Sequence, residues 1–112
     1  QVDPDIRNCT QPDVYCEHLR PRTSIGISAG DYLIIVLVEG PPSDPRAALT
    51  LEELAKLHIL LGSVDAIAMD GGGSTTLVID RGDGAEILNS PTDGSERTVS
   101  NHLVIFVRNR GN

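Results

Sequence analysis

At 112 residues the chain has the size of one domain, and its 39% of hydrophobic residues suffices for a globular core. Only 3% of the residues are aromatic, so we expect an aliphatic core. The net charge of −7 argues against nucleic acid or an anionic membrane as the main partner, because both favour basic surfaces. No apolar run approaches the roughly 20 residues of a membrane helix, so the sequence predicts no membrane span.

The first segment, residues 1–21, is polar and proline-containing and is expected to form a surface loop. A disulfide between Cys9 and Cys16 would close this loop, the alternative being two unpaired thiols. Asn8 begins an N-x-T acceptor for N-glycosylation. Both signals favour a secreted or lumenal protein, of lysosomal type or similar. Because the chain starts at Gln1 without a signal peptide, we expect a processed or engineered piece.

Regular patterns begin at Arg22. Residues 23–28 alternate as a strand does, and residues 29–31 are typical of a tight hairpin turn. Residues 32–39 form a nearly continuous apolar run rich in β-branched side chains, which predicts a strand buried on both faces. The loop expected at residues 40–46 contains three prolines.

One helix is clearly indicated. Thr50 and Glu53 have the spacing of a capping box, which predicts a helix start at Thr50. Gly62 is a suitable residue just beyond the helix end. His58 lies on or near the apolar face, where a packed core histidine is favoured over a catalytic one.

The remaining pattern predicts strands separated by turns. The expected strands are residues 66–69, 75–80, 86–88 and 99–107. Residues 81–84 read as a hairpin turn, in which Arg81-Gly82-Asp83 is better explained by turn chemistry than by integrin binding. Together these elements predict an α+β fold, with a mixed, mostly antiparallel β-sheet and one main helix packed on a face.

The most informative stretch is residues 69–76, a glycine-rich loop that joins two apolar runs. Each of its three glycines costs roughly 0.5–1 kcal/mol in chain entropy relative to alanine, so we expect positive φ or a close approach there. Nucleotide-binding glycine motifs require a following helix, whereas this loop leads into a predicted strand. A backbone anion-binding nest and a plain hairpin remain as alternatives.

Several side chains near predicted strand ends could carry chemistry. Asp70, Asp93 and Glu96 could supply the two carboxyl groups that glycosyl transfer needs. Arg22 and Arg97 could hold a phosphate or a sugar acid through a bidentate fork, or could simply be solvated or paired with carboxylates.

A Ser-His-Asp triad can also be drawn from Ser74, Asp70 and either His58 or His102. The sequence lacks the Gly-x-Ser-x-Gly elbow, and Ser74 opens a predicted strand instead of following one. The triad is therefore disfavoured.

Five segments in order resemble the phosphodiester glycosidase domain family. They are residues 22–26 (RTSIG), 49–55 (LTLEELA), 66–74 (AIAMDGGGS), 89–94 (NSPTDG) and 96–101 (ERTVSN). The resemblance runs from Arg22 to about Val107, and family domains carry further strands before the first of these segments. Residues 22–112 are therefore expected to be the C-terminal part of such a domain.

The resemblance implies hydrolysis of a glycosidic bond to phosphate, which releases a sugar such as N-acetylglucosamine and exposes a phosphomonoester. It implies a phosphate clamp formed by Arg22 and Arg97, with Asp70 or Glu96 as base or nucleophile. The substrate-binding residues that it implies are Thr23, Gly71, Gly72, Gly73, Ser74, Thr75, Asn89 and Asp93.

A second function is a non-catalytic carbohydrate-binding or phospho-glycan-binding fragment built on the same loop. The strands expected before Arg22 also predict a second chain that completes the domain, or a homo-oligomer. No cofactor is firmly indicated. The acidic loop residues Asp80, Asp83 and Asp93 make calcium a candidate, although their spacing is not that of an EF-hand.

Overall fold

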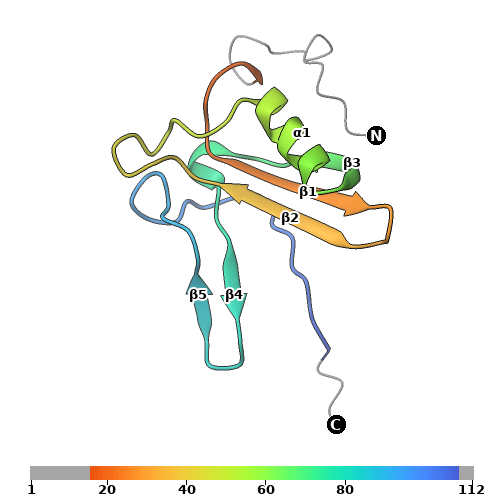
Figure 1. Cartoon of the computed structure of the whole chain (residues 1–112). Coiled ribbons are helices and arrows are strands. Elements are labelled where there is room, and N and C mark those ends of the chain that lie inside the picture. The colour runs from red at the N-terminus through yellow and green to blue at the C-terminus, as the bar shows by residue number, and fades with distance from the viewer. Residues whose placement is uncertain (1–15, 109–112) are drawn as a thin grey trace.

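The computed structural model describes residues 16–108 (Figure 1). The predicted glycosylation site at Asn8 and the first half of the predicted disulfide, Cys9, lie outside the described residues. Cys16 is fully buried. The Cys9–Cys16 pairing therefore stays a prediction, as does the division of the chain at residue 21.

The described chain is built around a three-stranded antiparallel sheet with the order β2-β1-β3 (Figure 1). The central strand is β1 (Arg22–Ser28), which pairs with β2 (Leu33–Val38) on one side and with β3 (Ser63–Ala68) on the other. The helix α1 (Leu51–Leu60) connects the two outer strands and contacts β3. This arrangement confirms the predicted α+β class with one main helix.

The turn between β1 and β2 is the predicted tight hairpin. Asp31 adopts a positive φ of 62°, and its amide donates to the carbonyl of Ser28 at 3.1 Å. The amide of Ser28 in turn donates to the carbonyl of Tyr32 at 3.0 Å, which closes the hairpin.

Strand β2 is not buried on both faces, so this prediction was wrong. Only Val36 of the strand is buried, whereas Leu33 is 53% and Ile35 is 44% exposed. Within residues 16–108, β2 pairs with β1 alone and forms an edge of the sheet. A run of apolar residues reports β propensity, but the number of neighbouring strands decides the burial.

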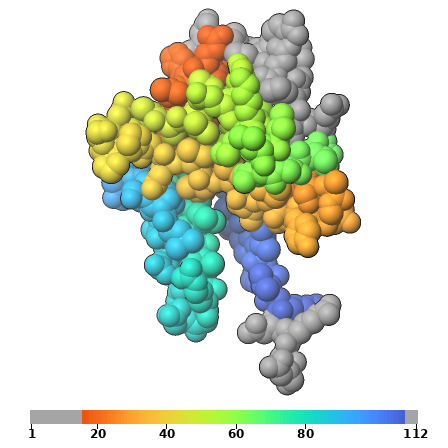
Figure 2. All heavy atoms as spheres, viewed as in Figure 1, coloured from red at the N-terminus to blue at the C-terminus, as the bar shows by residue number. Residues whose placement is uncertain are grey.

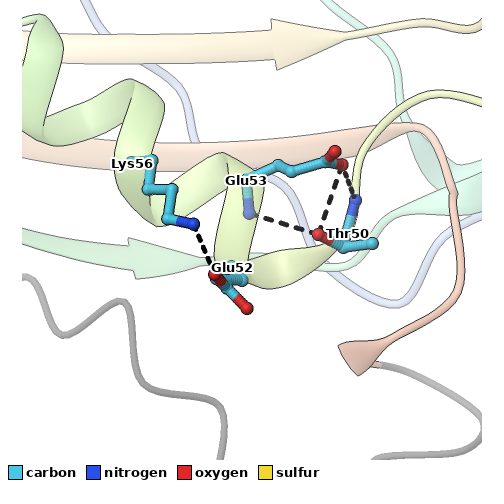
Figure 3. Close-up of polar contacts among 4 residues, drawn as sticks. All are labelled: Thr50, Glu52, Glu53 and Lys56. Carbon is cyan, nitrogen blue, oxygen red and sulfur yellow. Dashed lines mark hydrogen bonds and ion pairs between the residues drawn. The ribbon is translucent and has the colours of Figure 1, made fainter.

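Helix α1 begins with the predicted capping box (Figure 3). The Oγ1 of Thr50 accepts a hydrogen bond from the amide of Glu53 at 3.2 Å, and a Glu53 carboxylate oxygen accepts from the amide of Thr50 at 2.9 Å. Beyond the helix end, Gly62 adopts a φ of +89°. The buried face of the helix carries Leu54 and His58, as expected.

After β3 the chain makes a 3₁₀ turn, Gly72–Ser74, and then a small hairpin formed by β4 (Val78–Asp80) and β5 (Ala85–Ile87). Figure 1 shows that this hairpin extends away from the three-stranded sheet. The predicted strand at 75–80 is thus only partly formed, because its first residues leave the 3₁₀ turn. The turn at 81–84 is confirmed, and Asp80 accepts hydrogen bonds there from the amides of Gly82 and Gly84.

The predicted last strand, residues 99–107, is not formed. Residues 101–108 have no regular structure, and Phe106 and Val107 are 89% and 88% exposed. Figure 2 shows this segment, in dark blue, projecting from the body of the molecule. Its composition favours a strand, but a strand needs a hydrogen-bonded neighbour and none of the described strands lies beside it. No helix among the described residues has the length and apolar character needed to cross a membrane.

Candidate functional site

The glycine-rich loop leaves the end of β3 and packs against the chain that enters β1. The amide of Gly72 donates to the carbonyl of Pro21 at 2.9 Å, and a Cβ on Gly71 would lie only 2.6 Å from the same oxygen. The carboxylate of Asp70 is exposed and accepts from the amide of Gly71 at 2.9 Å. The carboxyl group predicted as base or nucleophile therefore lies at the entrance to the loop.

The three glycines are needed for different reasons. Gly72 has a φ of +60°, in the left-handed region that favours glycine, and nothing lies within 4 Å of where its Cβ would be. Gly71 and Gly73 are instead sites of close approach. The loop thus shows both features expected of a glycine cluster, a positive φ and the close approach of other atoms. Neither feature depends on the helix that nucleotide-binding motifs require.

A second loop, residues 89–97, lies directly on the glycine turn. A Cβ on Gly73 would be 2.3 Å from a carboxylate oxygen of Asp93 and 2.5 Å from a guanidinium nitrogen of Arg97. These two side chains are joined by an ion pair of 2.8 Å. The hydroxyl of Thr92 donates to the carbonyl of Gly72 at 3.3 Å. The structure thus brings together Gly72, Gly73, Asp93 and Arg97, which are separated by about twenty residues of sequence.

Asn89 fixes the backbone just after the turn. Its Oδ1 accepts from the amide of Leu77 at 2.8 Å, and its Nδ2 donates to the carbonyl of Thr75 at 2.9 Å. The side chain predicted to orient a substrate hydroxyl therefore also holds the two loops together.

Arg22 is placed differently from Arg97. The residue is 1% exposed, and its guanidinium donates to two backbone carbonyls, that of Leu49 at 3.0 Å and that of His18 at 2.8 Å. Its backbone borders the glycine loop through Pro21 and Gly71, but these side-chain contacts connect the start of β1 to the segments before and after it. The proposed phosphate-clamp role of Arg22 stays a prediction, whereas Arg97 contacts the glycine turn directly.

Two hydroxyl groups at the site are buried without a hydrogen-bond partner among the described residues. They are the Oγ1 atoms of Thr23 and Thr75, and the whole Thr75 residue is 1% exposed. Ser74, the last residue of the 3₁₀ turn, is half-buried. Burying a hydroxyl without a partner costs about 1–3 kcal/mol, so each of these two atoms would be stabilised by a hydrogen-bond partner.

Glu96 is exposed and precedes Arg97 in the second loop. Its carboxylate forms no ion pair within residues 16–108. Its role as an alternative to Asp70 stays a prediction.

The other predicted chemistries find little support in the described residues. Among residues 16–108, no three or more His, Cys, Asp or Glu side chains are grouped to hold a metal ion. Asp80 accepts from the amide of Gly82 in its hairpin turn and Asp93 pairs with Arg97, so two of the three acidic residues suggested for calcium have other contacts. His58 bonds to Ser24 and Ser63 instead of Ser74.

Sequence reasoning missed two contributors to the site. The carbonyl of Pro21 accepts from the glycine loop, and the hydroxyl of Thr92 donates to it. Thr92 lies inside the 89–94 segment, so its hydroxyl could have been included from that motif. The contribution of Pro21 is a backbone contact, which no side-chain pattern reveals.

Comparison with known proteins agrees with this geometry. A model of the family described as phosphodiester glycosidase matches residues 5–106, and the chain belongs to this family. The chain is also 30% identical over 96 residues to the SPbeta prophage-derived uncharacterized protein YomE of Bacillus subtilis (strain 168). That match covers 86% of this chain and 14% of the relative, so the chain spans a small part of the length of that protein.

Proposed function

We propose that this chain contributes the phosphate-binding side of a glycosidase site that cleaves a sugar-1-phosphodiester. Membership of the family supports a glycosidase-type activity. The finer proposal is that the bond between the sugar and the phosphate is hydrolysed, so that a sugar such as N-acetylglucosamine is released and a phosphomonoester remains.

The single observation that carries the proposal is the position of Arg97 on the glycine turn. Its guanidinium contacts Gly73, three residues from the exposed carboxylate of Asp70. A permanent cation beside close-packed backbone is a suitable site for an anionic group, and guanidinium matches the geometry of phosphate oxygens. The exposed carboxylate of Asp70 and the guanidinium of Arg97, both at this turn, support the proposal.

The chemistry fits these groups. Phosphate is a good leaving group, so the site mainly has to position the diester and stabilise the charge that develops on the phosphate oxygens. Arg97 would supply that stabilisation, and Asp70 would act as base or nucleophile at the sugar carbon.

The test is release of N-acetylglucosamine from an N-acetylglucosamine-1-phosphate diester. We expect activity in the unaltered chain, a loss of at least about 100-fold in Asp70→Asn, and no change in Asp83→Asn, whose carboxylate lies in the remote β4–β5 turn. Full activity in Asp70→Asn would remove Asp70 from its role.

A second function, binding of a phospho-glycan without turnover, is favoured by the small part of its relative that the chain spans. Saturable binding of the diester with no sugar release, even at high protein concentration, would select this function over hydrolysis.

We also propose a secreted or lumenal location and a further chain, or a second copy, that completes the domain. The exposed apolar side chains of Leu33, Ile35 and Ile67 on the sheet support the second of these proposals. A mass measurement of the intact particle would detect such a partner.

A further inference from the structure

We infer that Asp93 is a positioning residue that holds the guanidinium of Arg97 over Gly73, and that it does not itself bind the phosphate. This inference rests on the proposed function, in which Arg97 meets the phosphate. It replaces the direct substrate-binding role that the family resemblance implies for Asp93.

The geometry gives Arg97 two restraints. One terminal nitrogen donates to the Oδ2 of Asp93 at 2.8 Å, and the same guanidinium packs against the Cα of Gly73. Asp93 lies within a tight turn that has its own support, because Gly94 adopts a φ of +81° and its amide donates to the carbonyl of Pro91 at 2.9 Å. These contacts hold the guanidinium at the glycine turn, although the Arg97 side chain remains 53% exposed.

The contact with Asp93 leaves most N–H donors of the Arg97 guanidinium free for other hydrogen bonds. Arginine carries five N–H donors in a rigid plane, and within the described residues this ion pair is the single polar contact of the Arg97 side chain. The remaining donors can form the paired hydrogen bonds that guanidinium makes with phosphate oxygens.

Charge argues against a direct contact between Asp93 and the phosphate of the substrate. A carboxylate within a few ångströms of a phosphate repels it, whereas the same carboxylate bound to Arg97 neutralises part of the cation and fixes its plane. Asp93 therefore acts through Arg97. The expected consequence of its removal is a misplaced phosphate-binding group at an otherwise intact site.

The test compares Asp93→Ala, Asp93→Asn and a matched control, Glu86→Ala. The control breaks the exposed Arg81–Glu86 ion pair of 3.2 Å on the remote hairpin. We expect Asp93→Ala to lower kcat/KM on the diester about 10- to 100-fold, mainly through KM, because small misplacements of a binding group have effects of this size. Asp93→Asn keeps an acceptor oxygen and should recover most of the loss, and Glu86→Ala should have no effect.

A double variant separates positioning from direct contact. In an Arg97→Ala background, removal of Asp93 should cause no further loss. A further loss of similar size there, or unchanged kinetics in Asp93→Ala alone, would overturn the inference.

A readout without turnover keeps the inference separate from the proposed function. An unaltered chain that releases no sugar would contradict hydrolysis only. The NMR signal of the Arg97 Nε–H group then decides the inference: it should broaden or average in Asp93→Ala, and recover in Asp93→Asn. A signal unaffected by either substitution would overturn the positioning role.

Discussion

The Nε2 of His58 lies 2.7 Å from the Oγ of Ser24, which ties helix α1 to the central strand β1 through a buried hydrogen bond. The other ring nitrogen, Nδ1, lies 2.8 Å from the Oγ of Ser63 at the start of β3. Hydroxyl groups can donate or accept, so both partners satisfy a neutral imidazole in either tautomer. Burial lowers the pKa of His58 below its ordinary value of 6.5.

Acid should therefore destabilise the fold through His58. With a pKa lower in the folded chain than in the unfolded chain, the unfolded chain binds the additional proton. The contribution of the neutral ring is complete above about pH 6.5 and is lost as the pH falls toward the folded pKa. Urea unfolding at several values between about pH 5 and pH 8 should show a steeper acid loss in the unaltered chain than in His58→Gln. Equal slopes would contradict this prediction.

Gly26 is predicted to tolerate no side chain, because it faces the hydrogen-bonded pair of His58 and Ser63. A Cβ there would lie 2.4 Å from the Oγ of Ser63 and 2.7 Å from the Nδ1 of His58. Gly26→Ala should lower the free energy of unfolding by about 1–3 kcal/mol through overpacking. Gly30→Ala is the matched control, since its Cβ would meet the Tyr32 ring at an ordinary 3.4 Å. Similar losses in both variants would show that the crowding at Gly26 is relieved at little cost.

Local sequence signals predicted those parts of the fold that local interactions determine. The capping box at Thr50, the glycine at position 62 and the turns at 29–31 and 81–84 each depend on neighbouring residues, and all are present. The two wrong predictions, full burial of β2 and a final strand at 99–107, depend on which strands lie alongside. Apolar patterning cannot report the number of neighbours.

The candidate site likewise combines features that local sequence signals predict with features that depend on contacts distant along the chain. The glycine cluster at 71–73 marked the loop correctly, because its conformational cost is visible in the sequence. The contact of Arg97 with Gly73 joins two loops that are distant along the chain, and no local sequence pattern indicates that they meet. The burial of Arg22 against backbone carbonyls could not be read from its position before a strand.

The capping box is expected to contribute measurably to the free energy of unfolding. Thr50→Ala removes the acceptor for the Glu53 amide and is expected to cost about 1 kcal/mol, whereas Thr50→Ser keeps the hydroxyl and should cost much less. On the same helix, Lys56→Ala breaks the exposed ion pair with Glu52 and should cost less than about 0.5 kcal/mol (Figure 3). Chemical denaturation gives the three values. A larger loss from Lys56→Ala than from Thr50→Ala would contradict the assignment.

Neighbouring glycines of the loop should respond differently to alanine. Gly72→Ala strains a backbone with a φ of +60°. It should lower the free energy of unfolding by about 1 kcal/mol without moving Arg97. Gly73→Ala introduces a Cβ 2.5 Å from the Arg97 guanidinium and should displace its ion pair with Asp93. Because exposed ion pairs contribute at most about 1 kcal/mol, the main loss in Gly73→Ala is expected in activity. The NMR signal of the Arg97 Nε–H group distinguishes the variants, and a shift confined to Gly72→Ala would refute this explanation.

Asn89 is predicted to stabilise the turn through its side-chain amide, whose oxygen and nitrogen each form a hydrogen bond with the backbone. Asn89→Ala leaves the amide of Leu77 and the carbonyl of Thr75 without these partners, and should cost about 1–3 kcal/mol. Asn89→Asp keeps the acceptor for Leu77 and loses the donor to Thr75, so protection of the Leu77 amide should persist in Asn89→Asp and fall in Asn89→Ala. Hydrogen exchange measures this difference directly. A loss of activity in Asn89→Ala with unchanged Leu77 protection would instead assign Asn89 to the substrate, as the family resemblance implies.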